Sequence, residues 1–175
     1  MNNNCMNDFV KVLISNNKSI MIPEEENLYG IFVGEWDFDW YDHIDDPFPR
    51  HVKGEWLFQW ILEGLAVQDV FICPSRVTRK ENPPLDAAFG TTIRMYNPNK
   101  HVWDILYTEW GSSTCLEAYR EGDKIIQIAV DNDKLRWVFS EITQNSFKWQ
   151  RLIKGEDKDW IEVAKLYATR KYIKL

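Results

Sequence analysis

Gly34-Glu35-Trp36-Asp37-Phe38-Asp39-Trp40 alternates large aromatic side chains with short acidic ones. Successive side chains of a strand point to opposite faces, so the aromatic residues share one face and the aspartates share the other. The aromatic face is expected to be buried and the acidic face to meet water. The stretch therefore predicts a strand of an antiparallel sheet that covers an apolar interior.

The composition around this stretch narrows the class of protein. A chain of 175 residues has the size of one domain and can bury most of its apolar surface without disulfides or metals. Its 21 Lys and Arg against 27 Asp and Glu give a net charge of -6, which opposes binding to nucleic acid phosphates or to an anionic membrane. Aromatic residues make up 14% of the chain and favour strands, with either a heavy core or an aromatic-lined cavity.

The three cysteines, Cys5, Cys73 and Cys115, are scattered, with no close pair of the kind that holds zinc. We expect reduced thiols, no bound metal and no cofactor. Residues 1–6 are rich in Asn and carry no basic residue, and the apolar run 9–14 is short, so no secretory signal is expected. With no apolar run long enough to span a bilayer, the sequence predicts a cytoplasmic protein with no membrane partner.

Strand patterns follow one another along most of the chain. Residues 1–22 are predicted to form an N-terminal arm, and residues 23–30, with a proline and three acids in the first turn, a short helix. Residues 74–84 are predicted to be a loop. Ten strands are expected, the first beginning at Gly34 and the others at 52–63, 66–73, 89–96, 101–109, 113–120, 124–131, 134–143, 147–154 and 160–170.

Ten consecutive strands with short connections predict an all-β fold, a single antiparallel up-and-down barrel over residues 23–175. Closure removes the exposed strand edges, and a barrel of this size has room for one small ligand. An open sandwich of two sheets is the alternative. The turns predict registers in which Arg151 lies opposite Glu162, as an internal ion pair, and Arg94 lies opposite Trp103, as a stacked pair.

Gly34-Glu35-Trp36 resembles the Gly-x-Trp signature of the lipocalin and calycin barrels. Residues 28–170 resemble a family of uncharacterised bacterial lipocalin-like proteins, in the stretches Gly90–Tyr96, Arg136–Ile142, Ser146–Trp149 and Ala168–Arg170. The resemblance implies a closed barrel with a cavity and no established reaction. It also implies that the signature tryptophan, Trp36, lies at the closed end beneath Arg170 of the last strand. The acidic loop after the first strand, residues 42–46, departs from this pattern.

An aromatic interior with a few polar groups is typical of a small-molecule site. We expect a small hydrophobic or aromatic ligand, with a carboxylate held by the planar guanidinium of Arg94. The alternative is that the aromatic residues fill a solid core. The candidate ligand-binding residues are Trp40, Trp60, Arg94, Trp103, Tyr107, Glu117, Tyr119, Trp137, Trp149 and Arg151, and the structural residues are Trp36, Arg170 and Glu162.

Two other functions fit the same pattern. A buried Glu109, Glu117 or Glu141 would bind a proton more tightly and could act as general acid or base with Tyr107 or Tyr119, as in small barrel cyclases, isomerases or decarboxylases. The spacing does not select catalysis over binding. A filled barrel whose outer strands pair into a homodimer is the third hypothesis. The histidines, His43, His51 and His101, border loops and turns and are expected on the surface.

Overall fold

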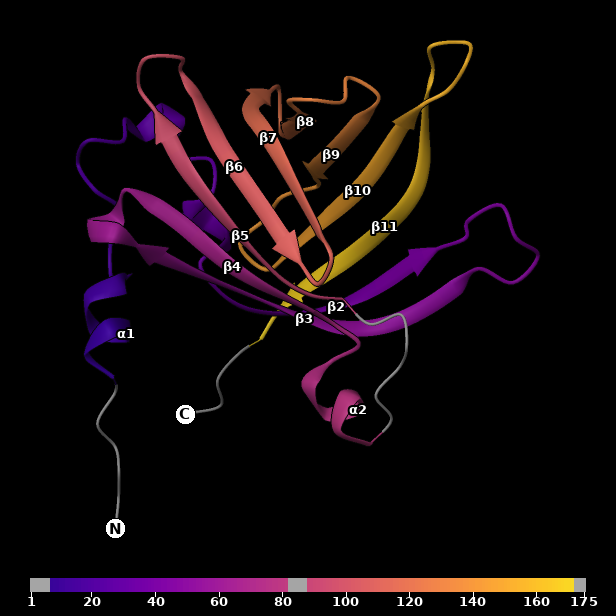
Figure 1. Ribbon diagram of the computed structural model, residues 1–175, viewed down its shortest axis with the longest axis horizontal. Coiled ribbons are helices and arrows are strands. Elements are labelled where there is room, and N and C mark those ends of the chain that lie inside the picture. Colours follow the sequence, from indigo (N-terminus) through magenta and orange to yellow (C-terminus); the bar gives the residue numbers. More distant parts are fainter. Residues whose placement is uncertain (1–6, 82–87, 172–175) are drawn as a thin grey trace.

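Ten strands close into one antiparallel barrel in the computed structural model, which describes residues 7–81 and 88–171. Each strand pairs with the next along the chain, and β11 pairs with β2 to close the barrel (Figure 1). The predicted closed barrel is confirmed, and the open sandwich is wrong. The strands are β2 (Gly34–Asp42), β3 (Arg50–Ile61), β4 (Ala66–Cys73), β5 (Ala88–Asn97), β6 (Val102–Glu109), β7 (Ser112–Glu121), β8 (Lys124–Ala129), β9 (Leu135–Ser140), β10 (Ser146–Lys154) and β11 (Trp160–Arg170).

The first barrel strand has the two faces that its alternation predicts. Trp36 and Phe38 are buried, whereas Glu35 and Asp37 are exposed on the outer side. Gly34 has a φ of +126°, and a Cβ at this position would lie 2.7 Å from Nη1 of Arg170. Only glycine allows both this backbone conformation and this close approach of the arginine.

The N-terminal segment contains the short α-helix of the fold, at a different place from the one predicted. Helix α1 spans Asp8–Leu13 and begins where the side chain of Asn7 accepts a hydrogen bond from the amide of Phe9. Strand β1 (Ile14–Ser15) then pairs with the end of β3. The helix predicted at 23–30 is instead two short 3-10 helices, η1 (Glu24–Glu26) and η2 (Gly30–Phe32). Residues 1–6 of the predicted arm lie outside the described residues.

The segment that follows β1 fills one end of the barrel. Ile22, Leu28, Tyr29 and Phe32 are all buried and join the core cluster with Trp36. This end of the interior is therefore solid. The two predicted alternatives, a solid aromatic core and a cavity, each describe one end of the barrel, because a cavity lies at the other end.

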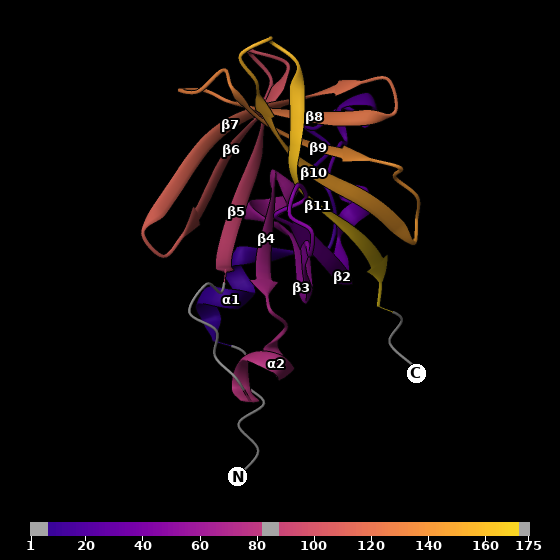
Figure 2. The same cartoon turned by 90° about the vertical axis from the view of Figure 1, so that its right-hand side faces the viewer.

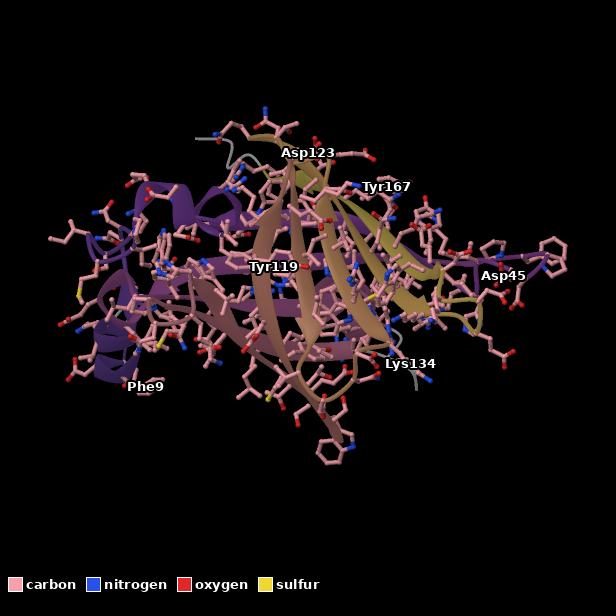
Figure 3. The ribbon with its side chains drawn as sticks, turned by 90° about the horizontal axis from the view of Figure 1, so that it is seen from above. Phe9, Asp45, Tyr119, Asp123, Lys134 and Tyr167 are labelled. Atoms are coloured by element: carbon pink, nitrogen blue, oxygen red, sulfur yellow. The ribbon has the colours of Figure 1, made fainter. Side chains whose placement is uncertain are left out.

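The connections β2–β3, β4–β5, β6–β7, β8–β9 and β10–β11 lie at the open end. Figure 3 shows Asp45, in the β2–β3 loop, at the opposite end of the molecule from Phe9 of α1. The predicted loop 74–84 contains a second helix, α2 (Arg76–Glu81), and residues 82–84 lie outside the described residues. Both helices lie outside the barrel wall (Figure 2). At the closed end, η3 (Leu62–Gly64) joins β3 to β4.

Two predicted registers are wrong. Arg94 lies opposite Ile105, and Trp103 lies opposite Tyr96, because the turn between β5 and β6 has four residues, 98–101, in place of two. Arg151 lies opposite Ala164 and not Glu162, because the turn pairs Lys154 with Trp160 and a bulge between Arg151 and Leu152 adds a second shift of one residue. No helix among the described residues is long and apolar enough to cross a bilayer.

Candidate functional site

A cavity of about 270 Å³ opens at the end of the barrel opposite α1. Its volume lies near the lower bound of small-molecule sites, roughly 300 to 1,000 Å³. Inward-facing residues from β2, β3, β4, β5, β6, β9 and β10 form its wall. They are Trp40, Asp42, Arg50, Trp56, Phe71, Cys73, Ala88, Thr92, Arg94, Tyr107, Glu109, Trp137, Trp149 and Arg151.

Aromatic rings in mutual contact form most of the wall. The ring centroids of Trp40 and Trp149 are 5.6 Å apart, and those of Trp149 and Trp137 are 5.7 Å apart. Tyr107 meets Trp137 edge-on at 5.3 Å. These separations are typical of favourable aromatic pairs, so the rings fix one another in place. They present a preformed apolar surface to the cavity.

A charged pair from β2 and β3 lies beside this wall. Arg50 donates from Nε and Nη2 to the two oxygens of Asp42, at 2.8 and 2.6 Å. The indole N–H of Trp40 donates to the same carboxylate at 2.9 Å. Partial burial would raise the pKa of Asp42, but the hydrogen bonds from Arg50 and Trp40 outweigh it and hold that pKa below its usual range. Asp42 therefore stays ionised and its charge is balanced.

A buried polar network forms the floor of the cavity. Arg94 donates to Asp69, and both side chains are almost wholly inaccessible. The guanidinium carbon of Arg94 lies 4.9 Å from the ring centroid of Tyr29, whose hydroxyl accepts a hydrogen bond from Gln127 at 2.8 Å. Burial raises the pKa of Tyr29 to about 12. Since buried charges are tolerated when they are paired, Asp69 explains how Arg94 can lie inside the barrel.

Tyr107, Glu109 and Arg151 lie together on another part of the wall. Burial, and after it the negative charge of Glu109, raises the pKa of Tyr107 well above its usual range, while the charge of Arg151 lowers it. Tyr107 thus keeps its proton and can donate a hydrogen bond at any physiological pH. The hydroxyl of Ser112 lies 3.4 Å from Glu109.

Six of the ten predicted ligand-binding residues line the cavity, and their role in binding stays a prediction. Trp60 and Trp103 also face inward but lie in the filled end, where the indole N–H of Trp103 donates to the carbonyl of Glu26 at 2.9 Å. The sequence gives no signal that residues 22–33 enter the barrel and cover them. The six that line the cavity are Trp40, Arg94, Tyr107, Trp137, Trp149 and Arg151.

The predicted inward orientation of Glu117 and Tyr119 is wrong, because they alternate with the buried residues of β7 and so face outward. Glu117 forms an ion pair with Lys100 at 2.7 Å on the outer surface. Glu162 pairs with Lys165 at 2.9 Å and not with Arg151. The predicted face is wrong in β7 because Leu116 and Ala118, and not the aromatic Tyr119, occupy the inner positions.

The structural pair at the closed end has the geometry that the lipocalin resemblance implies. The guanidinium carbon of Arg170 lies 4.2 Å from the ring centroid of Trp36. Arg170 also donates to the carbonyls of Ile31 and Val33 at 2.6 and 2.8 Å. The last strand is thereby tied to the segment that fills the barrel.

Sequence reasoning missed several residues of the cavity wall. Trp56 and Phe71 alternate with outward residues and could have been assigned from a correct hairpin register. The sequence predicts that Asp42 and Arg50 belong to a loop, yet they form the last pair of the β2–β3 ladder. Their pairing could have been predicted from the sequence, because Asp42 and Arg50 lie at equal distances from the tip of the loop and carry opposite charges.

No group of three or more His, Cys, Asp or Glu residues in the described part of the chain could hold a metal ion. Among the histidines, His51 interacts with Asp39 at 2.6 Å on the outer face of the sheet. Cys73 lines the cavity, whereas Cys115 is exposed outside the barrel. Cys5 lies outside the described residues.

The chain matches no family model and no curated protein. Solved structures that share its fold include the following two. Rv2717c from M. tuberculosis aligns with a TM-score of 0.57 at 9% identity, covering 86% of this chain and 99% of its own. The S-type phycobiliprotein lyase CpeS from Guillardia theta aligns with a TM-score of 0.55 at 13% identity, covering 86% of this chain and 97% of its own. At these identities the likeness extends to the barrel fold alone.

Proposed function

We propose that this protein binds a small, flat aromatic molecule in the cavity at the open end of the barrel. The observation that carries the proposal is the cavity of about 270 Å³ whose wall is built from Trp40, Trp137, Trp149 and Tyr107 in mutual contact. Aromatic side chains hold flat ligands by stacking and edge contacts, each worth about 0.5 to 1.5 kcal/mol beyond the buried area.

The division of the barrel supports the same proposal. The closed end is filled by residues 22–33 and held by Arg170, so it supplies a rigid base. Above this base, the ring contacts leave a space of fixed shape, which lowers the entropy that a ligand must lose on binding. A barrel that served only as a filled assembly module would gain nothing from keeping one end hollow, because empty interior space lowers stability.

A cavity-filling variant tests the proposal against a matched control. Ala88 lines the cavity, whereas its neighbour Phe89 is 53% exposed and faces outward. Ala88→Trp should occupy the cavity and abolish binding of naphthylethanol in isothermal titration calorimetry. Phe89→Trp should bind as the unchanged protein does. Equal binding by the two variants would place the ligand elsewhere and refute the proposal.

A catalytic role for the same cavity is the second candidate. It is favoured by one observation, the position of Glu109 beside Tyr107 on the cavity wall. A tyrosine that keeps its proton can polarise a carbonyl group, and a carboxylate can accept a proton from the adjacent carbon. Glu141, which is exposed, and Glu117, which faces outward, cannot take part from their positions. Deuterium exchange into a bound naphthyl ketone, lost in Glu109→Gln, would support this activity, and exchange at the uncatalysed rate would contradict it.

A further inference from the structure

The five charged side chains that line the cavity differ in whether a neighbour already balances their charge. Arg50 forms two hydrogen bonds with Asp42, so this pair is neutral as a unit. Arg94 is paired with Asp69 behind the wall. The cation that the sequence favoured as the carboxylate anchor is therefore already occupied.

Arg151 and Glu109 are the two charged side chains of the cavity whose charge no described neighbour balances. Among the residues that the structure describes, no carboxylate forms an ion pair with Arg151, and no cation forms one with Glu109. The hydroxyl of Ser112 donates a hydrogen bond to Glu109 at 3.4 Å. Glu109 follows Tyr107 by two residues on the inner face of β6, and Arg151 lies opposite Trp137, whose ring meets that of Tyr107 at 5.3 Å. Both charges therefore flank the contact between Tyr107 and Trp137.

The aromatic wall begins next to these charges. Tyr107 meets Trp137 edge-on, and Trp137 in turn contacts Trp149. A ligand whose ring packs against the two tryptophans would place its substituents near Tyr107, between an unpaired cation and an unpaired anion. Each charge of the protein would then need a complement on the ligand.

We propose, on the basis of the function proposed above, that the ligand is a zwitterionic aromatic molecule, with a carboxylate bound by Arg151 and a protonated amine bound by Glu109. A ligand with a carboxylate alone satisfies Arg151 but brings a like charge to Glu109. A ligand with an amine alone does the reverse. Only a ligand with both groups gives Arg151 and Glu109 each a partner of opposite charge, and such complementary charges determine selectivity.

Four compounds with the same naphthyl ring test this charge pattern. Naphthylalanine carries both charges, naphthylpropanoate the carboxylate, naphthylethylamine the amine, and naphthylethanol neither. We expect naphthylalanine to bind most tightly in calorimetry, with the loss of either charge weakening binding about threefold to tenfold, as for partly exposed charged contacts.

Two variants assign each charge to its residue. Arg151→Gln should remove the advantage of a carboxylate and leave binding of naphthylethylamine unweakened. Glu109→Gln should remove the advantage of an amine and leave binding of naphthylpropanoate unweakened. Thermal unfolding of both variants checks that they fold, which is expected because both side chains lie at the edge of the cavity.

The outcomes separate this inference from the proposal that it rests on. If all four compounds bind equally, or if naphthylpropanoate binds as tightly as naphthylalanine, the aromatic site stands and the zwitterionic ligand is refuted. Unchanged charge preference in both variants, as expected if Arg151 and Glu109 only pair with each other in solution, refutes it as well. If none of the four compounds binds, both proposals fail.

Discussion

Trp36 at the closed end of the barrel offers the sharpest test of how the fold is held together. Its side chain is fully buried, its indole N–H donates to the carbonyl of Phe32 at 2.7 Å, and its ring lies 4.7 Å from that of Phe147. Truncating a buried tryptophan to alanine costs about 3 to 5 kcal/mol, and leaving a buried carbonyl without its donor adds about 1 to 3 kcal/mol. The sum approaches the whole stability of a typical domain, about 5 to 15 kcal/mol.

Trp36→Phe keeps a ring in place and loses only the hydrogen bond and part of the packing, so the variant should fold. We expect its free energy of unfolding to fall by about 1 to 3 kcal/mol. Trp110, which is fully exposed at the β6–β7 turn, is the matched control, and Trp110→Ala should change that free energy by less than about 0.5 kcal/mol. Urea denaturation followed by far-UV circular dichroism measures both. Equal midpoints and slopes for the two variants would refute the view that Trp36 is the base of the barrel.

Two further predictions concern buried charges. Glu55 accepts hydrogen bonds from Arg76 and Lys171; burial alone would raise its pKa, but these partners lower it from 4.5 to about 2. The ionised Glu55 stabilises the fold by at most about 3 kcal/mol; this stabilisation is complete above pH 4.5 and disappears as the pH falls towards 2. Glu55→Gln should therefore flatten the dependence of the free energy of unfolding in urea on pH between these values. An unchanged pH profile would contradict this. Arg94→Met leaves Asp69 buried and unpaired and should lower the free energy of unfolding by about 3 to 5 kcal/mol, whereas Arg94→Met combined with Asp69→Leu should recover much of the loss in the same assay. If the double variant is no more stable than Arg94→Met alone, the main role of Arg94 is not to neutralise the charge of Asp69.

Local alternation was enough to predict the strands, and the strand count was enough to predict a closed barrel. Faces were assigned correctly for Trp40, Trp137 and Trp149. They were also correct for Arg94 and Arg151, because each predicted register is wrong by two residues and a shift of two leaves the face unchanged. In β7 the assignment of Glu117 and Tyr119 failed, because the inner positions are held by the smaller Leu116 and Ala118 and the aromatic residue lies on the outer face.

The rest depended on contacts between distant segments. Nothing in the local sequence around Trp103 indicates that Glu26 and Tyr29 will cover it. The pairing of Arg94 with Asp69 joins residues 25 positions apart across β4 and β5, and the long connection between these strands predicts no register for them. Periodicity therefore identified the inner face, but it could not show which half of that face is hollow.

The position of the ligand is tested most directly by fluorine NMR on protein labelled with fluorotryptophan, titrated with naphthylethanol. The chain has nine tryptophans. Those that line the cavity are Trp40, Trp56, Trp137 and Trp149. We predict that their resonances shift together with one affinity, while those of Trp36, Trp60, Trp103, Trp110 and Trp160 stay in place. Shifts confined to this second group, or no shift at saturating ligand, would contradict a binding site inside the open end of the barrel.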